Sequence, residues 1–330
     1  MGLEALSALG RKARQDARAI AGVFISVCAL ALAGCASMWP QTAALREGLP
    51  ADLPQKVELT QVPFFPQEEY QCGPAALATT LASFGVNVTP EQLVPQVYIP
   101  ERKGSLQVEM LAAARRHGLV SYQIAPRFED LLRELAAGHP VIVLQKLGIG
   151  DGWHYAVAVG YDYDSGELIL RSGTTERQVL NFTVQEMVWK RSGYWAMVAL
   201  PPQRIPATAN EQRWLGAIAA MERAGQPAAA RTAYARFLER WPQNVNAAVG
   251  LANSHHTLGA LPEAERVLRA AVERAPDSVI ALNNLAQTLS DQGKHAEALP
   301  YIERAAAAGG PFAAAVQETH ETIRKRLAGN

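Results

Sequence analysis

One cysteine lies in surroundings that suit a reactive thiol. Of the three cysteines, only Cys72 lies outside the apolar N-terminal segment, and it is followed by Gly73 and Pro74. The proline and a glycine at position 85 predict a helix over residues 72–84, with the thiol in its first turn. The N-terminus of a helix favours a thiolate, and its free amide groups can donate to an oxyanion. We therefore expect Cys72 to be a nucleophile, with Gly73 leaving room for substrate to approach the sulfur.

A base and a further oxyanion donor can be assigned from their positions in the chain. Gln67 lies five residues before the cysteine and can place its side-chain amide beside the same oxyanion. His154 opens a predicted strand directly after the glycine-rich loop 148–152, which would let a substrate backbone pass close by. We expect His154 to be the general base that takes the thiol proton.

Several of the other histidines have more ordinary interpretations. His117 is expected to cap the C-terminus of a helix beside Arg116, and His139 is expected to pack at the surface in a helix-to-strand turn. His255 and His256 are adjacent on one predicted helix, so they point in different directions and are not expected to share a metal ion. Because a single thiol remains in the body of the chain, we expect no disulfide scaffold and no cysteine-based zinc site. We expect neither a metal nor a cofactor.

The segment 63–77 resembles that of the bacteriocin-processing, double-glycine-leader cysteine peptidases and their lipoprotein relatives, a papain-like clan. The resemblance covers residues 57–202 and includes the order of elements: a cysteine helix, a helical middle, a Gly-His-Pro-Val-Ile-Val strand and then the histidine strand. It implies that Gln67 is the oxyanion residue, Cys72 the nucleophile and His154 the general base. It also implies small residues, such as Gly-Gly, before the scissile bond. The glutamine precedes the cysteine by five positions here, where much of the clan has six.

The sequence leaves open which residue orients the imidazole. The clan places Asp or Asn on the strand after the histidine, where it accepts a hydrogen bond from the ring. If the hairpin is two residues longer here, this position falls near Ser172, which could orient the ring but would stabilise an imidazolium little. Asp162 and Asp164 are acidic candidates in or near the turn. The site is therefore either a Cys72–His154 dyad or one in which another group orients the histidine.

The N-terminal segment has the pattern of a lipoprotein signal peptide. Four basic residues between positions 11 and 18 precede an apolar run over residues 19–33, which is short for a membrane-spanning helix. The run ends in Leu-Ala-Gly-Cys, which resembles the lipobox of bacterial lipoproteins. This resemblance implies a signal peptide over residues 1–34 and lipidation of Cys35. The alternative is an uncleaved signal anchor that contains a cysteine.

The residues after the lipobox indicate where such a protein would be sorted. Ala36, in place of an aspartate, favours the outer membrane of a Gram-negative cell by the same resemblance. We expect an exported lipoprotein on the periplasmic face, with a membrane contact through its lipid. Residues 35–56 are rich in Pro, Gln and Ala and are interpreted as a tether.

The C-terminal third repeats with a period of 34 residues. Gly225, Gly259 and Gly293 are each 34 apart, and an alanine follows five residues after each of them. Glycine at the inter-helix turn, a small residue where the helices cross and proline at the exit resemble the tetratricopeptide repeat. The predicted parts are a linker (203–210) and a repeat region (211–330) with units 211–244, 245–278 and 279–312 and a capping helix.

Such an array commonly binds a peptide or a protein partner on its concave face, and the alternative is that it only stabilises or spaces the first domain. The first domain, residues 57–202, has predicted helices before antiparallel strands. The predicted fold class is therefore an α+β papain-like cysteine peptidase domain followed by an all-α tetratricopeptide-repeat solenoid. The 31 basic and 31 acidic residues form no long basic run, so no nucleic-acid partner is expected.

These observations favour a membrane-anchored thiol peptidase that cleaves a peptide bond, with the repeats docking its substrate or a partner. Two other functions stay open. The chain could be a non-catalytic assembly or binding lipoprotein with a peptidase-like fold, which the missing acidic residue favours. It could also be a papain-like acyltransferase that passes the acyl group to an amine instead of water.

Overall fold

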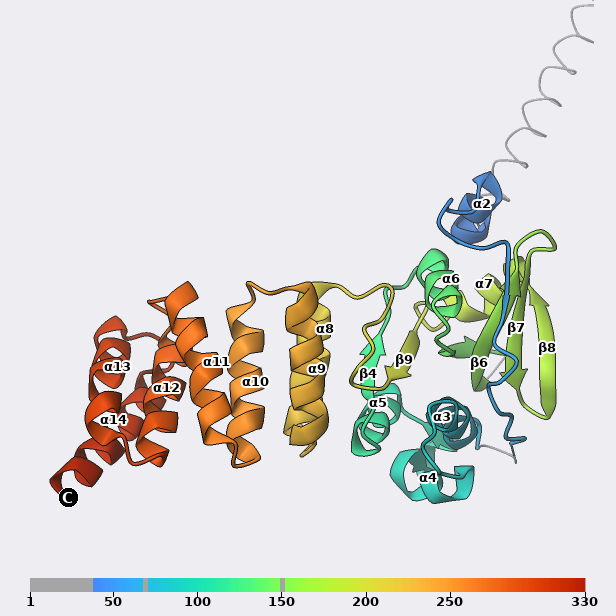
Figure 1. The fold of residues 1–330 in the computed structure, drawn as a ribbon. Coiled ribbons are helices and arrows are strands. Elements are labelled where there is room, and N and C mark those ends of the chain that lie inside the picture. Colours follow the sequence, from blue (N-terminus) through green and yellow to red (C-terminus); the bar gives the residue numbers. More distant parts are fainter. Residues whose placement is uncertain (1–37, 68–70, 149–151, 330) are drawn as a thin grey trace, which may run out of the picture.

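Figure 1 shows a computed structural model of the chain, which describes residues 38–67, 71–148 and 152–329. An α+β domain lies at one end, and a row of helices extends from it to the C-terminus. The predicted order of an α+β domain followed by an all-α region is thus confirmed. The expected signal peptide and the lipobox cysteine Cys35 lie outside the described residues. Within the described ranges, no helix combines the length and apolar character needed to cross a membrane.

The α+β domain contains short helices that precede or interrupt one large sheet. Its helices are α2 (Pro40–Glu47), α3 (Cys72–Ala82), α4 (Pro90–Val97), α5 (Gln107–Arg116), α6 (Phe128–Ala136) and α7 (Phe182–Lys190), with a 3-10 turn at Pro100–Arg102. Its strands are β1 (Lys56–Glu58), β2 (Tyr98–Ile99), β3 (Gly104–Ser105), β4 (Val120–Gln123), β5 (Val141–Lys146), β6 (Trp153–Asp162), β7 (Glu167–Ser172), β8 (Thr175–Asn181) and β9 (Ala196–Leu200). The cysteine helix and the histidine strand have the predicted positions, whereas β4 and the β2–β3 hairpin were not expected.

The sheet is antiparallel and has the order β4-β9-β5-β6-β7-β8, with β1 pairing to β6. Strand β6 is the longest, and its first half pairs with β5, so that His154 lies opposite Gln145. Its second half pairs with β7. The candidate base therefore lies at the start of the strand, where pairing with β5 positions its backbone.

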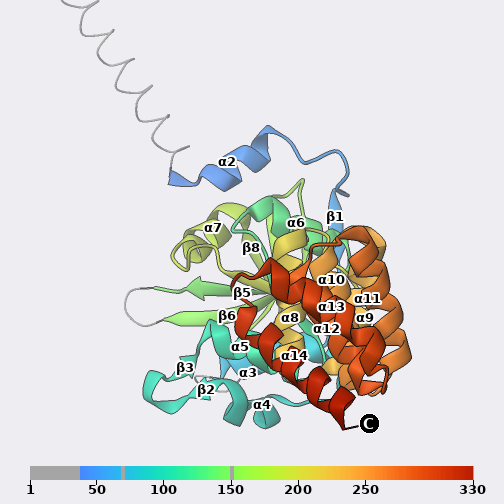
Figure 2. The ribbon, with the colours of Figure 1, turned by 90° about the vertical axis from the view of Figure 1, so that its left-hand side faces the viewer.

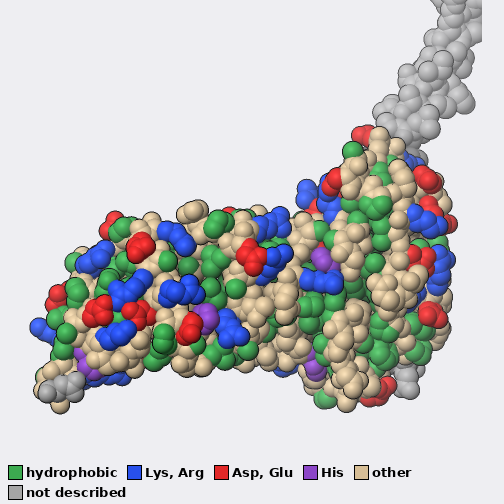
Figure 3. Space-filling view, in the orientation of Figure 1, with side chains coloured by type: hydrophobic (Ala, Val, Ile, Leu, Met, Phe, Trp, Pro, Cys, Tyr) green, Lys and Arg blue, Asp and Glu red, His purple; other side chains and the backbone are tan. Residues whose placement is uncertain are grey.

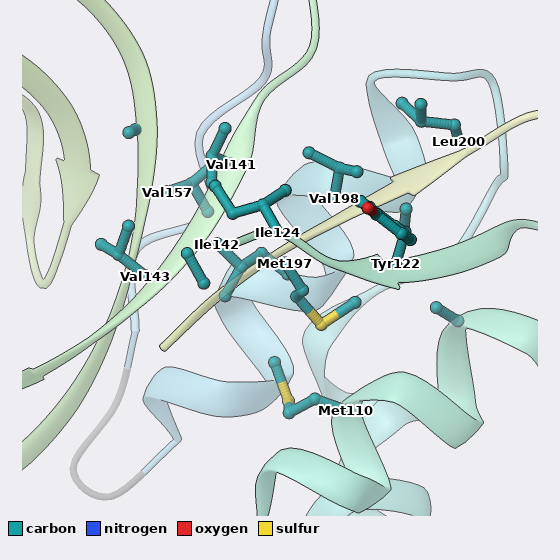
Figure 4. Packing of buried hydrophobic residues seen from close by; sticks show 14 of the residues in the cluster. Met110, Tyr122, Ile124, Val141, Ile142, Val143, Val157, Met197, Val198 and Leu200 are labelled. Atoms are coloured by element: carbon teal, nitrogen blue, oxygen red, sulfur yellow. The ribbon is translucent and has the colours of Figure 1, made fainter. Parts of the chain in front are cut away.

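The centre of the domain is filled by apolar side chains from the sheet and the helices against it. Figure 4 shows Val141, Ile142 and Val143 of β5 near Val198 of β9, with Met110 of α5 below them. All of these side chains are fully buried. Helix α3 also packs on β5, β6 and β7, so burial of this core sets the position of the cysteine.

The segment expected to be a tether, residues 35–56, is docked on the domain in its described part. Helix α2 begins after Trp39, and the fully buried Glu186 accepts hydrogen bonds from the backbone N–H groups of Gln41 (3.1 Å) and Thr42 (2.6 Å). The first turn of α2 has no acidic side chain, so Glu186 supplies the acceptor that its free amides need. The sequence prediction failed here because the partner lies about 145 residues away.

The C-terminal region is built of paired helices with the predicted period. They are α8 (Glu211–Arg223), α9 (Pro227–Arg240), α10 (Val245–Thr257), α11 (Leu261–Arg274), α12 (Val279–Asp291), α13 (His295–Ala308) and the final helix α14 (Ala313–Ala328). Gly225, Gly259 and Gly293 lie in the turns within each pair and have φ between 76° and 80°. This left-handed conformation explains why glycine recurs there.

The first repeat shares one hydrophobic core with the α+β domain. Trp214 of α8 is fully buried, and its ring contacts Tyr122 of β4 edge to face at 5.7 Å. The buried Glu134 accepts hydrogen bonds from the backbone N–H groups of Ala207 (3.2 Å) and Thr208 (2.8 Å), which holds the segment between the domains. His139 is also buried beside Glu134, at 2.7 Å, so the expected surface position of this histidine is wrong. Its polar partner on α6 is what permits its burial.

Acidic and basic side chains alternate over the repeat array on the face seen in Figure 3. Glu265 is paired with both Arg269 (2.8 Å) and Lys294 (2.6 Å), which links consecutive repeats. His256 is hydrogen bonded to Asp291 at 2.9 Å. These contacts place charge of both signs across the joints between repeats.

Candidate active site

Cys72 is the first residue of α3, and its thiol is partly exposed. Burial raises the pKa of the thiol, while hydrogen bonds from backbone N–H groups, those of Tyr155 and Gly73 among them, act in the opposite direction. Burial has the larger effect. The contact with Tyr155 places the sulfur beside the residue that follows His154 on β6. The folded site therefore brings the predicted nucleophile next to the predicted base, with the thiol protonated at neutral pH.

The imidazole of His154 is half-buried and has a hydroxyl partner. Its Nε2 lies 2.9 Å from Ser172 Oγ, at the end of β7. Burial lowers the pKa of His154 to about 4. Within the described parts of the chain, no hydrogen bond joins the ring to the Cys72 thiol. The two groups thus form a neutral pair at neutral pH, and Nδ1 is the nitrogen left for the thiol proton.

Of the three orienting candidates considered from the sequence, only Ser172 reaches the histidine, and Asp164 is exposed in the turn after β6. Asp162 lies at the opposite end of β6, where its carboxylate pairs with Lys56 Nζ at 2.7 Å. This ion pair lowers the pKa of Asp162. Because a strand rises about 3.3 Å per residue, the separation of eight positions along β6 keeps His154 and Asp162 far apart.

Gln67 is held by the turn that follows Ser172. Its backbone N–H donates to the Gly173 carbonyl at 3.2 Å, and its side-chain amide packs against the same glycine. One short segment, residues 172–173, therefore contacts both the candidate base and the candidate oxyanion donor. The predicted set thus comes from two parts of the chain, the segment that holds Gln67 and Cys72 and the strand that holds His154.

Two residues near the site were missed by the sequence analysis. Arg171 is 7% exposed, and its guanidinium donates to the carbonyls of Val62 and Glu176, which fastens the segment before Gln67 to the β7–β8 hairpin. Tyr155 is buried under the thiol, and its hydroxyl donates to the Ser105 carbonyl at 3.1 Å. Burial raises the pKa of Tyr155, and the nearby Cys72 raises it further. Neither residue has a sequence signal, because each acts through a backbone carbonyl.

Loop 148–152 can be described only at its ends, because residues 149–151 lie outside the described structure. The Leu147 N–H donates to the Gly152 carbonyl at 2.7 Å, which closes the base of the loop. A Cβ on Gly152 would lie 2.2 Å from the Leu147 carbonyl oxygen, so this closure requires glycine. No group of three His, Cys, Asp or Glu side chains suited to a metal is found in the described ranges.

Comparison with known proteins identifies the two parts of the chain. Residues 59–197 match the model of the Peptidase_C39 like family. The α+β domain is a C39-like peptidase domain. Residues 217–279 and 261–314 match the tetratricopeptide-repeat model. The chain is also 33% identical over 93 residues to an uncharacterized protein of Methanothermobacter thermautotrophicus, a match that covers 28% of this chain and 59% of that protein.

Solved structures similar to each part are known. A C39-like peptidase from Bacillus anthracis is 17% identical, with 44% of this chain and 98% of that chain covered and a TM-score of 0.38. The peptidase domain of Streptococcus ComA, a bi-functional ABC transporter, is 21% identical, with 42% and 98% covered and a TM-score of 0.36. For the repeats, the TPR2B domain of yeast Sti1 is 19% identical, with 33% and 91% covered and a TM-score of 0.32.

Gly73 of the peptidase domain is enclosed, which corrects the expectation that it leaves room for substrate. It is buried, and a Cβ built on it would lie 2.2 Å from Ser105 Oγ and 2.6 Å from Ser105 Cβ. We expect Gly73→Ala to destabilise the peptidase domain by about 1–3 kcal/mol, because β3 must move away from α3. Urea unfolding would measure this, and Gly73→Ala with Ser105→Gly should recover most of the loss. An unchanged midpoint in Gly73→Ala would contradict the packing described.

The low pKa of His154 makes the stability of the peptidase domain depend on pH. The unfolded chain protonates this histidine near its ordinary pKa of 6.5 and the folded domain near 4, so acid favours the unfolded state. The stability contribution is present above pH 6.5 and is lost as pH falls to 4, by about 3 kcal/mol. Unfolding free energies of the wild type and His154→Asn at pH 7 and pH 4 would measure it. The variant should lose less stability over this interval, and an equal loss would contradict the prediction.

Proposed function

We propose that this chain is a thiol peptidase that cleaves a peptide bond through Cys72 and His154. The observation that carries the proposal is the meeting of three elements: the thiol at the start of α3, the imidazole on β6 with Ser172 at 2.9 Å, and Gln67 anchored on Gly173. The family of the domain supports a peptidase.

The neutral resting pair determines the order of the steps. Cys72 Sγ attacks the substrate carbonyl carbon while its proton passes to His154 Nδ1, so that thiolate and imidazolium form only during the attack. The oxyanion accepts hydrogen bonds from the Gln67 side chain and from backbone N–H groups at the start of α3. His154 Nε2–H donates to Ser172 Oγ and keeps the ring oriented. The imidazolium then protonates the leaving amine, and water hydrolyses the thioester.

The chain is further proposed to be a lipoprotein anchored through Cys35 on the periplasmic face, in the outer membrane. The lipobox-like sequence supports this, and replacement of Cys35 with alanine should release the protein from the membrane fraction. The repeats are proposed to dock the peptide substrate or a protein partner, as tetratricopeptide arrays commonly do. We also propose that the peptide substrate has small residues before the scissile bond.

A non-catalytic binding role is the second candidate, and a specific observation favours it. Burial raises the pKa of Cys72 and lowers that of His154, and a serine stands where a carboxylate would stabilise an imidazolium. Each of these disfavours the ion pair that activates many thiol enzymes. Measured turnover decides between the two candidates.

The test is hydrolysis of peptides that contain Gly-Gly or similar small residues, measured for the wild type and for three variants. We expect Cys72→Ala and His154→Ala each to lower kcat/KM by at least about 10³-fold. Gln67→Ala should lower kcat by about 10²–10³-fold, because one oxyanion donor is lost. Asp162→Asn is the control and should leave the rate unchanged. Turnover that survives Cys72→Ala would overturn the assignment, and its absence in the wild type on every peptide would favour the binding role.

A further inference from the structure

The first described residues, helix α7 and the ends of β5 and β6 form one surface strip. Figure 2 shows the start of α2, helix α7 and the β5–β6 hairpin along the same side of the peptidase domain, at the left of the view. Two hydrogen bonds connect them, since Lys190 Nζ donates to the Met38 carbonyl at 3.2 Å and Arg191 donates to the Gly148 carbonyl at 3.0 Å. The strip therefore runs without interruption from residue 38 to the hairpin beside His154.

Large apolar side chains are exposed along this strip. Between 40% and 56% of each is accessible, which is unusual for residues of this kind in one region. Val184 and Met187 are three residues apart on α7 and share its outer face, while the side chains between them are buried. The exposed apolar members of the strip are Met38, Leu147, Trp153, Val184 and Met187.

Basic side chains accompany the apolar ones. Lys190 lies over the ring of Trp39 at 5.9 Å, and Lys146 lies over the ring of Trp153 at 4.7 Å. The exposed side chains of α7 include no carboxylate, because Glu186 of this helix is turned inward to α2. Aromatic rings beside cations, with apolar side chains around them, are typical of surfaces that lie at a membrane interface.

The length of chain before the strip specifies what can cover it. Cys35 precedes Met38 by three residues, which span at most about 11 Å when extended. Because α2 is docked on Glu186, only these few residues separate the strip from the apolar N-terminal segment, and there is no long tether between them. This holds whether the segment is replaced by lipid on Cys35 or itself remains in the bilayer.

We propose that this strip rests on the surface of an anionic lipid bilayer, with α7 in the headgroup region and the ends of β5 and β6, next to His154, at the membrane. The proposal builds on the anchoring proposed above, and it adds a fixed orientation of the peptidase domain in which the end of β6 that holds His154 lies toward the bilayer. Each Lys or Arg side chain near an anionic membrane surface strengthens binding of the protein to that surface about fivefold at moderate salt.

The test uses a chain that begins at residue 36, which retains every described residue and has no lipid. Its flotation with vesicles of phosphatidylcholine plus 30% phosphatidylglycerol is compared with flotation on phosphatidylcholine alone. We expect the protein to bind the anionic vesicles, and we expect this binding to weaken as salt is added. Binding should fall at least tenfold in the double variant Val184→Ser with Met187→Ser and in the double variant Lys190→Ser with Arg191→Ser. The control, Leu258→Ser with Phe312→Ser, changes apolar residues of similar exposure on the repeats and should bind like the wild type.

Absent binding, equal binding to both kinds of vesicle, or binding unaffected by the strip variants would each overturn the proposal. Variants that slow peptide cleavage and leave vesicle binding unchanged would show that the strip contacts substrate instead. Anchoring is tested separately by membrane fractionation of the full chain with Cys35→Ala, so failure of the anchor and failure of the strip give different results.

Discussion

Replacing Ser172 with aspartate is expected to increase the alkylation rate of Cys72 at pH 6 at least tenfold. The hydroxyl of Ser172 lies 2.9 Å from His154 Nε2, so a carboxylate at this position would face the ring directly. An opposite charge at this range raises a histidine pKa by about 1–3 units, and the pKa of His154 starts from about 4. The imidazolium formed would in turn favour the thiolate of Cys72. The alkylation rate against pH measures the thiolate fraction.

Two control variants separate charge from shape. Ser172→Asn offers a similar side chain without charge and should leave the alkylation rate within about threefold of the wild type, since it cannot offset an imidazolium. Thr174→Asp adds the same charge to an exposed residue of the same turn, where solvent screens it, and should also have little effect. An aspartate variant with an unchanged alkylation profile would show that Ser172 does not govern the ionisation of the pair.

Trp214→Ala is expected to destabilise the peptidase domain together with the first repeat, by about 3–5 kcal/mol. The indole lies fully buried in a core cluster that contains side chains of both parts, and it contacts Tyr122 of β4. Removing it leaves a cavity at the junction. In a chain that begins at residue 36, Cys72 is the one cysteine, and the rise in its alkylation rate above the folded-state rate during urea unfolding reports on the peptidase domain alone.

The matched control is Leu285→Ala on α12, in the third repeat. Leu285 is also fully buried, but it belongs to a separate cluster formed by α10 to α14. Its removal should destabilise the outer repeats by about 2–5 kcal/mol and leave the midpoint of Cys72 exposure unchanged. If Trp214→Ala left that midpoint unchanged as well, the two parts would unfold independently and the shared core would contribute little.

Local sequence signals predicted the parts of this fold that depend on local physics. The helix at Cys72 has proline in its first turn, and the repeat period is visible because glycine is needed at each left-handed turn. Residue types alternate along positions 154–161, and this two-residue period, which is typical of a strand, predicted the central strand. The two-part architecture follows from these elements.

What the sequence did not predict depends mostly on partners distant in the chain. Helix α2 is fixed by Glu186, which is 144 residues from Thr42, whereas His139 pairs with Glu134 only five residues away and is buried because the fold encloses both side chains. Gly73 was expected to be open, and only the fold shows that Ser105 fills the space. For the site, the sequence left Ser172 and Asp162 as alternatives, because the length of a hairpin decides which of them reaches the ring. The roles of Gln67, Cys72 and His154 stay predictions until turnover is measured.

The shared core at Trp214 has a consequence for any molecule that touches both parts of the chain. Because Glu134 holds the connecting segment and α8 packs on β4 and α5, the repeats cannot swing freely about the peptidase domain. If the repeats dock the substrate as proposed, a peptide bound along the array would present to Cys72 a bond at a set number of residues from its docking point. Lengthening such a peptide between these two points would move the cleavage site by the same number of residues, whereas a flexible joint would tolerate the change.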